Sequence, residues 1–202
     1  FMYSDDCEYI GNVFRNNGAG VAVMYTKRVH MVANRFEKNW GSSAYGLLLK
    51  EIADSRIERN VFEENTTGLY ADGADRIRAT GNDFNRNGWA VRVGGSTLNG
   101  LFTANNFVDN TFDVTTNSQD PSTKFEGNYW NAYKGYDLDR NGIGDVPHAP
   151  VRLFAVIVEK NPQSIVLMRS ALVSILDMAE RAMPSLTPAL FVDARPAMKR
   201  LG

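Results

Sequence analysis

An acidic loop in the second half of the chain carries the residue types of a calcium site. Oxygen ligands occur at the spacing of a calcium-binding loop: Asp137, Asp139, Asn141, the backbone carbonyl of Ile143, and Asp145. Gly142 stands where such loops turn sharply, but His148 occupies the twelfth position, which normally holds a bidentate glutamate. The loop therefore predicts either a structural Ca²⁺ site or a cap whose carboxylates accept backbone N–H groups.

Two methionines are candidates for binding a soft metal. Met2 and Met24 each stand ten residues before an asparagine of the repeat described below. Because their neighbours Phe1 and Val23 are expected to face inward, alternation points both thioethers outward. Thioether sulfur favours Cu(I), and His30 could join the pair only across a turn. The alternative interpretation is an apolar ladder or contact patch.

The sequence lacks the residue patterns typical of a catalytic site. Outward carboxylates such as Glu8, Glu58 and Asp109 do not recur in one column, as an enzyme acting on acidic polysaccharides would require. Cys7, the single cysteine, falls in an inward column and is expected in the core. The charges of the 22 basic and 23 acidic residues nearly cancel, so the composition does not predict a basic surface for binding nucleic acid. The most apolar stretch, 165–176, is too short to span a membrane. We expect a non-catalytic protein.

These candidates are positioned by a repeat of about 22 residues. Its marker is an Asn-x-Phe corner, with asparagines at Asn12, Asn34, Asn60, Asn82 and Asn105, and a final Asn128 followed by Trp130. A second asparagine follows five positions after five of these corners. Short alternating runs broken by Gly and Asn leave no room for a helix in each repeat. The pattern therefore favours a parallel β-helix over a leucine-rich repeat.

Aligning the coils on the corner asparagines predicts their interior. The position three residues earlier holds an apolar column: Tyr9, Met31, Ile57, Ala79, Phe102 and Phe125. The preceding position is expected to face solvent and holds Glu8, His30, Arg56 and Arg78. We predict an all-β, right-handed parallel β-helix of about six coils over residues 1–133, with stacked asparagines. Extra residues between Asn34 and Asn60 predict a loop carrying Trp40. The repeat is already running at residue 1, so we expect a chain truncated at its N-terminus.

Beyond the coils, residues 134–150 are predicted to form a capping loop and residues 151–202 a helical tail. Ser164 is expected to cap a helix with an apolar stripe. The predicted partner-binding residues are Leu153, Phe154, Ile165, Met168, Leu172, Ile175 and Leu176. This tail either folds back on the last coils or docks on a partner, and we favour docking. We therefore expect that deleting residues 164–202 leaves the coils folded.

Several motifs together resemble the NosD family, the periplasmic β-helix accessory proteins of nitrous-oxide reductase maturation. They are Met2-Tyr-Ser-Asp-Asp6, the Asn-x-Phe coils, Gly127-Asn-Tyr-Trp130, Gly135-Tyr-Asp-Leu-Asp139, Gly142-Ile-Gly-Asp145 and Glu159-Lys-Asn-Pro162. The resemblance spans the whole chain. It implies a non-catalytic protein that engages the membrane subunits of an ABC transporter and receives copper from a membrane-anchored chaperone. Such a protein assists assembly of the copper–sulfide centre of the reductase.

The resemblance supplies no set of metal ligands, so Met2, Met24 and His30 rest on the residues alone. The resemblance implies that the tail from about Leu153 to Leu190 is the transporter-docking element. Copper would be a transient cofactor, and calcium a structural one. The alternative function is a secreted carbohydrate-binding or carbohydrate-processing β-helix, which predicts an aromatic or carboxylate-lined groove along one face.

Overall fold

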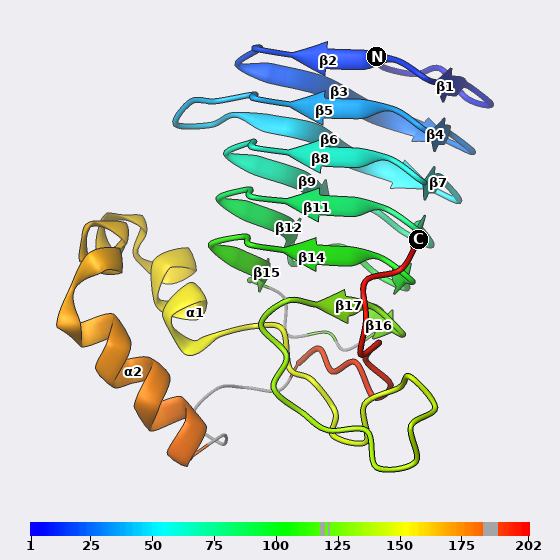
Figure 1. The fold of residues 1–202 in the computed structure, drawn as a ribbon. Coiled ribbons are helices and arrows are strands. Elements are labelled where there is room, and N and C mark those ends of the chain that lie inside the picture. Colours follow the sequence, from blue (N-terminus) through cyan, green and yellow to red (C-terminus); the bar gives the residue numbers. More distant parts are fainter. Residues whose placement is uncertain (118–119, 121, 184–189) are drawn as a thin grey trace.

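Three parallel sheets wind around one core in the computed structural model, which describes residues 1–117, 120, 122–183 and 190–202 (Figure 1). The first sheet contains β1 (Glu8–Ile10), β4 (His30–Val32), β7 (Arg56–Glu58), β10 (Arg78–Thr80), β13 (Leu101–Thr103) and β16 (Lys124–Glu126). The second contains β2 (Val13–Arg15), β5 (Arg35–Glu37), β8 (Val61–Glu63), β11 (Asp83–Asn85), β14 (Asn106–Val108) and β17 (Tyr129–Trp130). The third contains β3 (Ala19–Lys27), β6 (Tyr45–Ala53), β9 (Thr67–Asp72), β12 (Trp89–Val93) and β15 (Phe112–Thr116). The predicted parallel β-helix with a helical C-terminal part is confirmed.

The corner asparagines form a continuous hydrogen-bonded ladder. Asn60 shows the pattern, because its backbone N–H and its Nδ2 donate to Oδ1 of Asn82 at 2.9 and 3.0 Å. Its Nδ2 also donates to the carbonyl of Met31 at 2.9 Å, and its Oδ1 accepts two bonds from Asn34. A second ladder, from Asn17 to Asn110, follows the same rule. Each buried amide thus uses both its donors and its acceptor, which explains why asparagine recurs at these corners.

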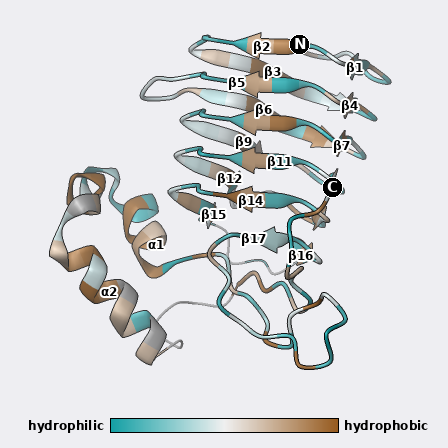
Figure 2. Cartoon of the chain, in the orientation of Figure 1, coloured by the Kyte–Doolittle hydropathy of each residue, from teal (hydrophilic) through white to brown (hydrophobic). Residues whose placement is uncertain are grey.

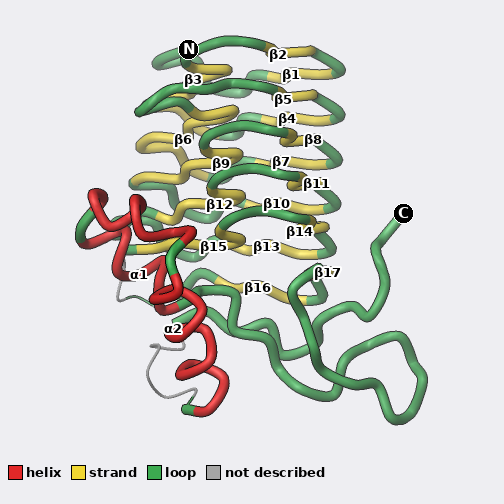
Figure 3. The backbone as a smooth tube through the Cα atoms, turned by 60° about the vertical axis from the view of Figure 1, so that its left-hand side comes forward, coloured by secondary structure: helices red, strands yellow, loops and turns green. Residues whose placement is uncertain are grey.

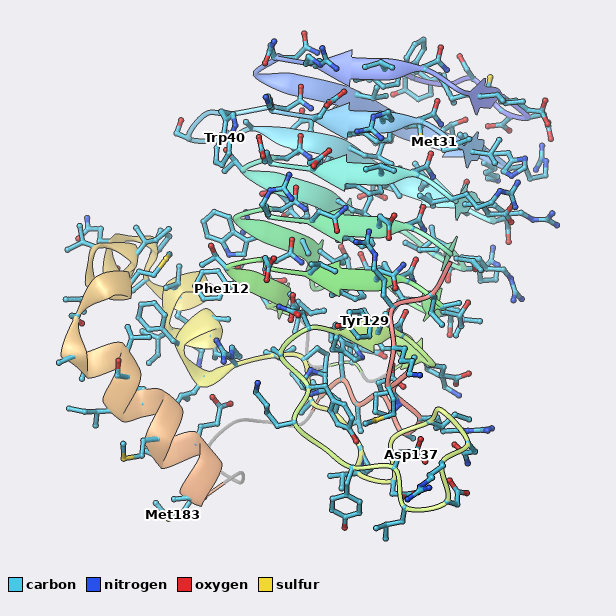
Figure 4. The ribbon with its side chains drawn as sticks, in the orientation of Figure 1. Met31, Trp40, Phe112, Tyr129, Asp137 and Met183 are labelled. Atoms are coloured by element: carbon cyan, nitrogen blue, oxygen red, sulfur yellow. The ribbon has the colours of Figure 1, made fainter. Side chains whose placement is uncertain are left out.

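Aromatic rings stack along the core from coil to coil. Phe62 lies 4.8 Å from Phe36 and 4.8 Å from Phe84 between ring centroids, which is the spacing of adjacent strands. The predicted inward column is buried from Met31 onward, and Tyr9 is half-buried. The extra residues after Asn39 form the loop before β6, where Trp40 is 57% exposed (Figure 4).

The described residues of the tail form three short helices rather than one long one. Helix α1 (Leu153–Lys160) is followed by a 3₁₀ helix, η1 (Pro162–Arg169), and by α2 (Ala171–Ala182). The prediction that Ser164 caps a helix running through the apolar stripe is wrong, because the extended backbone of Ser170 breaks that stripe. Serine favours such boundaries, and the β-branched Ile165 and Val166 are weak helix formers.

The chain after the helices returns to close the solenoid. Phe191 is buried against Phe125, with ring centroids 5.4 Å apart, and Asp193 pairs with the last coil in the manner of a further strand. Asp193 accepts hydrogen bonds from the backbone N–H of Gly127 and Asn128, both at 2.9 Å, and from Nε1 of Trp130 at 3.0 Å. Because residues 164–202 contain this cap, the contacts of Asp193 argue against the prediction that deleting the segment leaves the coils folded.

His148 lies under the last coil, beside this cap. Its ring centroid is 5.1 Å from that of Trp130 and 5.6 Å from that of Tyr133, and its backbone N–H and carbonyl pair with Asp193. Burial lowers the pKa of His148 to about 4, although the charge of Asp193 opposes that shift. The folded protein therefore holds a neutral imidazole at physiological pH.

We expect His148 to make the cap sensitive to acid. Its folded pKa lies below the unfolded value, so its contribution is complete above about pH 6.5 and is lost as the pH falls through about 4. When the pH is lowered from 7 to 4.5, the free energy of unfolding of the wild type should fall by about 2 kcal/mol more than that of the His148→Phe variant. Urea unfolding of both chains at the two pH values measures this, and a constant difference would contradict it.

Candidate metal and partner-binding sites

The two candidate copper ligands lie on adjacent coils. Met2 and Met24 form a parallel bridge, and the backbone N–H of Tyr3 donates to the carbonyl of Met24 at 3.2 Å. Beside them Tyr3 and Tyr25 stack with ring centroids 5.3 Å apart. Met2 is 50% exposed and Met24 is half-buried. Two neighbouring thioethers with access to solvent fit the ligand preference of Cu(I).

His30 faces a different set of groups. It lies on β4, in another sheet than Met24, and its ring nitrogens approach Glu58 at 3.2 Å and Glu8 at 3.8 Å. The structure thus brings Met2 and Met24 together and leaves His30 outside the pair. Cys7 is half-buried, and its thiol donates to the carbonyl of Asp5 at 3.5 Å.

The carboxylates of the acidic loop are engaged by the loop itself. Asp137 accepts backbone N–H groups from Asn141 at 3.1 Å and Gly142 at 2.8 Å. Asp145 accepts the N–H of Leu138 at 2.7 Å, Asn141 Oδ1 accepts that of Ile143 at 2.8 Å, and Asp139 accepts both the N–H and the side-chain amide of Asn141. Desolvation opposes ionisation of Asp137, but these hydrogen bonds outweigh it and lower its pKa.

This geometry gives the calcium prediction no support. Within the part of the chain that the structure describes, no three His, Cys, Asp or Glu side chains come together as a metal site. The observed bonds are those of the alternative interpretation, a turn whose carboxylates satisfy backbone N–H groups.

The predicted partner-binding residues divide into two groups. Phe154 is buried against Phe112 at 6.1 Å between ring centroids, and Met168 and Leu176 pack on the same cluster. Leu153 is half-buried, and its backbone N–H donates to Glu180 at 3.2 Å. These residues attach the helices to the solenoid, as Figure 3 shows for α1 beside β15. The exposed group contains Ile165, Leu172 and Ile175.

Helix α2 carries two apolar faces. Val173 and Leu176 face the cluster around Phe112, whereas Leu172, Ile175 and Met178 form a second stripe that is exposed. Ile175 is 61% and Met178 is 71% exposed, and the apolar character of this helix is visible in Figure 2. Met178 was missed by the sequence analysis, although it stands three residues after Ile175 and therefore continues the stripe. Contiguous exposed apolar side chains on one helix are typical of a partner interface.

An ion pair fastens α1 to the third sheet. Arg92 on β12 contacts Glu159 at 2.9 Å, and its guanidinium lies 5.0 Å from the ring centroid of Tyr70 and 5.7 Å from that of Trp89. A cavity of about 370 Å³ lies beside these rings, between the sheet and the helices. Because Arg92 covers one face of each ring, that face is not free to stack against a sugar, as the carbohydrate alternative would require.

The fold defines a class of protein: a parallel β-helix with an attached helical segment, which exposes Met2 on its coils and an apolar stripe on α2. Residues 1–135 match the family model described as NosD, periplasmic copper-binding protein, and the chain belongs to this family. None of the described helices is long and apolar enough to cross a membrane.

Two relatives carry the name "Probable ABC transporter binding protein NosD". The one from Stutzerimonas stutzeri is 25% identical in an alignment of 198 positions that covers 88% of this chain and 44% of the relative. The one from Pseudomonas aeruginosa is 26% identical over 160 residues, covering 79% of this chain and 33% of the relative. The chain thus spans less than half the length of the relatives it matches.

Proposed function

We propose that this chain is part of a non-catalytic periplasmic accessory protein that works with an ABC transporter to assemble the copper–sulfide centre of nitrous-oxide reductase. The observation that carries the proposal is the exposed apolar stripe of α2, since the solenoid leaves it uncovered in a family whose relatives are named for transporter binding. In this proposal Leu172, Ile175 and Met178 contact the membrane subunits of the transporter. Docking exposed apolar helices in a groove is a common recognition mode.

The coils have a separate role in this proposal. Copper is a transient cargo, received from a copper chaperone and passed towards nitrous-oxide reductase, and the Met2–Met24 pair is its contact point. The description of the family as copper-binding supports copper as the cargo. The adjacency of Met2 and Met24 supports this pair as its contact point.

Cu(I) affinity tests this role. We expect the 202-residue chain to bind Cu(I) in competition with a chromophoric chelator under reducing conditions, and the Met2→Leu, Met24→Leu double variant to bind at least about tenfold more weakly. The control removes two other exposed methionines, Met178→Leu with Met183→Leu. Equal affinity of the two double variants would contradict the assignment. Saturable binding to a panel of acidic glycans without copper uptake would contradict the proposed function.

A further inference from the structure

The outer face of the first sheet carries a groove lined by Arg56, Arg78 and Lys124. Arg56 on β7 lies directly opposite Arg78 on β10, and Lys124 follows on β16, with all three side chains exposed. They line a cavity of about 510 Å³ together with Asn99, Ser122 and the half-buried Leu101. The groove lies away from the helices and from the Met2–Met24 pair, and no role described above uses it.

The fold balances charges between coils at other places. Arg28 reaches Asp6 at 2.6 Å, Arg76 reaches Asp54 at 2.7 Å and Arg15 reaches Glu37 at 2.7 Å, each time across one coil step. By contrast, Arg56, Arg78 and Lys124 form no ion pair with any residue that the structure describes.

Two of the carboxylates near these cations are engaged by other residues. Glu58 contacts His30, and Asp54, which also borders the groove, is held by Arg76. Two like charges directly opposite each other on neighbouring strands are destabilising. An anion bound between Arg56 and Arg78 would relieve this repulsion.

We propose that this groove binds an extended acidic segment of a partner protein. The planar guanidinium groups of Arg56 and Arg78 are suited to bidentate recognition of carboxylates. Three coil steps of about 4.8 Å separate Arg56 from Lys124, so the cations span roughly 14 Å, the length of about four extended residues.

The remaining lining favours a peptide over a glycan. Leu101 lies between Arg78 and Lys124 in register and offers an apolar contact, while Asn99 and Ser122 carry side chains that can bond a peptide backbone. None of the described residues lining the groove is aromatic, so sugar rings find no stacking surface there.

Fluorescence anisotropy with the 202-residue chain and a fluorescein-labelled Glu-Glu-Leu-Glu-Glu peptide tests the proposal. We expect saturable binding that weakens as NaCl rises from 0.05 to 0.5 M, and no binding of the Gln-Gln-Leu-Gln-Gln counterpart. The Arg56→Gln, Arg78→Gln variant should raise the dissociation constant by about tenfold or more. The matched control, Arg140→Gln with Arg195→Gln, removes the same charge at exposed positions outside the groove and should bind like wild type.

Two further readouts separate binding from structure. If the arginines exist for a ligand, the Arg56→Gln, Arg78→Gln variant should melt at or above the wild-type temperature, because a repulsion has been removed. A lower melting temperature, or equal peptide affinity in the two double variants, would overturn the proposal. Displacement of the labelled peptide by oligogalacturonate at lower concentration than by unlabelled peptide would also overturn it, since the groove would then be a glycan site.

Discussion

Replacing Asp193 by alanine is expected to lower the free energy of unfolding by about 3 to 5 kcal/mol. The carboxylate is fully buried and accepts the backbone N–H of Gly127, the backbone N–H and Nδ2 of Asn128, and Nε1 of Trp130. Alanine would leave these donors without an acceptor in a site that water does not reach, and an unmade buried hydrogen bond costs more than a made one contributes. Urea unfolding followed by circular dichroism measures the loss.

Two comparisons make this prediction specific. Asp193→Asn keeps one carbonyl oxygen for the donors of Asn128, but it turns an N–H₂ group towards Gly127, so we expect an intermediate loss. Asp139→Ala removes an exposed carboxylate of the acidic loop and should cost less than about 1 kcal/mol. Amide exchange of Asn128 should accelerate only in the Asp193 variants. A wild-type unfolding curve for Asp193→Ala would show that the cap does not stabilise the coils.

The second large effect is expected on helix α2. Leu172→Glu with Ile175→Glu should weaken association with the purified transporter by at least about 100-fold, because two charges would have to be buried at the centre of an apolar contact. Both side chains are exposed in the free chain, so the variant should fold like wild type. Biolayer interferometry on the transporter in nanodiscs measures the affinity, and a melting curve checks the fold.

The control for this surface uses the same helix and the same charge. Ser174 is exposed beside the apolar stripe, so Ser174→Glu should leave transporter affinity unchanged where Ile175→Glu alone reduces it. Equal effects of the two single substitutions would indicate general electrostatic repulsion rather than docking by the stripe. The experiment needs the whole tail, because truncation at residue 164 would also remove Asp193.

The coils were predictable from the sequence because every coil has to meet the same two structural requirements. A buried corner needs a side chain that both donates and accepts, and a strand must alternate, so the columns of asparagine and of apolar residues follow directly from the period. The closing segment could not be predicted in this way. Asp193 performs the work of a corner asparagine but lacks the following x-Phe, and it joins Asn128 from 65 residues away.

The candidate sites also combine features that follow from the sequence with features that depend on tertiary packing. The adjacency of Met2 and Met24 follows from the repeat, and so does that of Glu8 and His30, whereas the 3.2 Å contact of His30 with Glu58 depends on side-chain geometry that the repeat does not give. The apolar stripe of the tail was visible in the sequence, but its division between an inner face, with Leu176, and an outer face, with Ile175, depends on how the helices pack against β15. Periodicity predicts which side chains are apolar; only tertiary packing decides which of them stay uncovered.

The hydrogen bonds of the asparagine ladder all run in one direction, and the ladder ends at a residue that cannot continue it. In every rung of the first ladder, the asparagine of one coil donates to the side-chain oxygen of the next, from Asn12 onward to Asn128. Asp193 accepts from Asn128 but has no amide hydrogens to pass on, so the series ends there. Whole coils could be gained or lost before Asn128 during evolution without changing the chemistry of any rung. Beyond Asp193 this ladder has no further rung, and the bridges of Phe125 with Asp193 and of Tyr129 with Ala197 cover edges of the last coil that could otherwise pair with a second molecule.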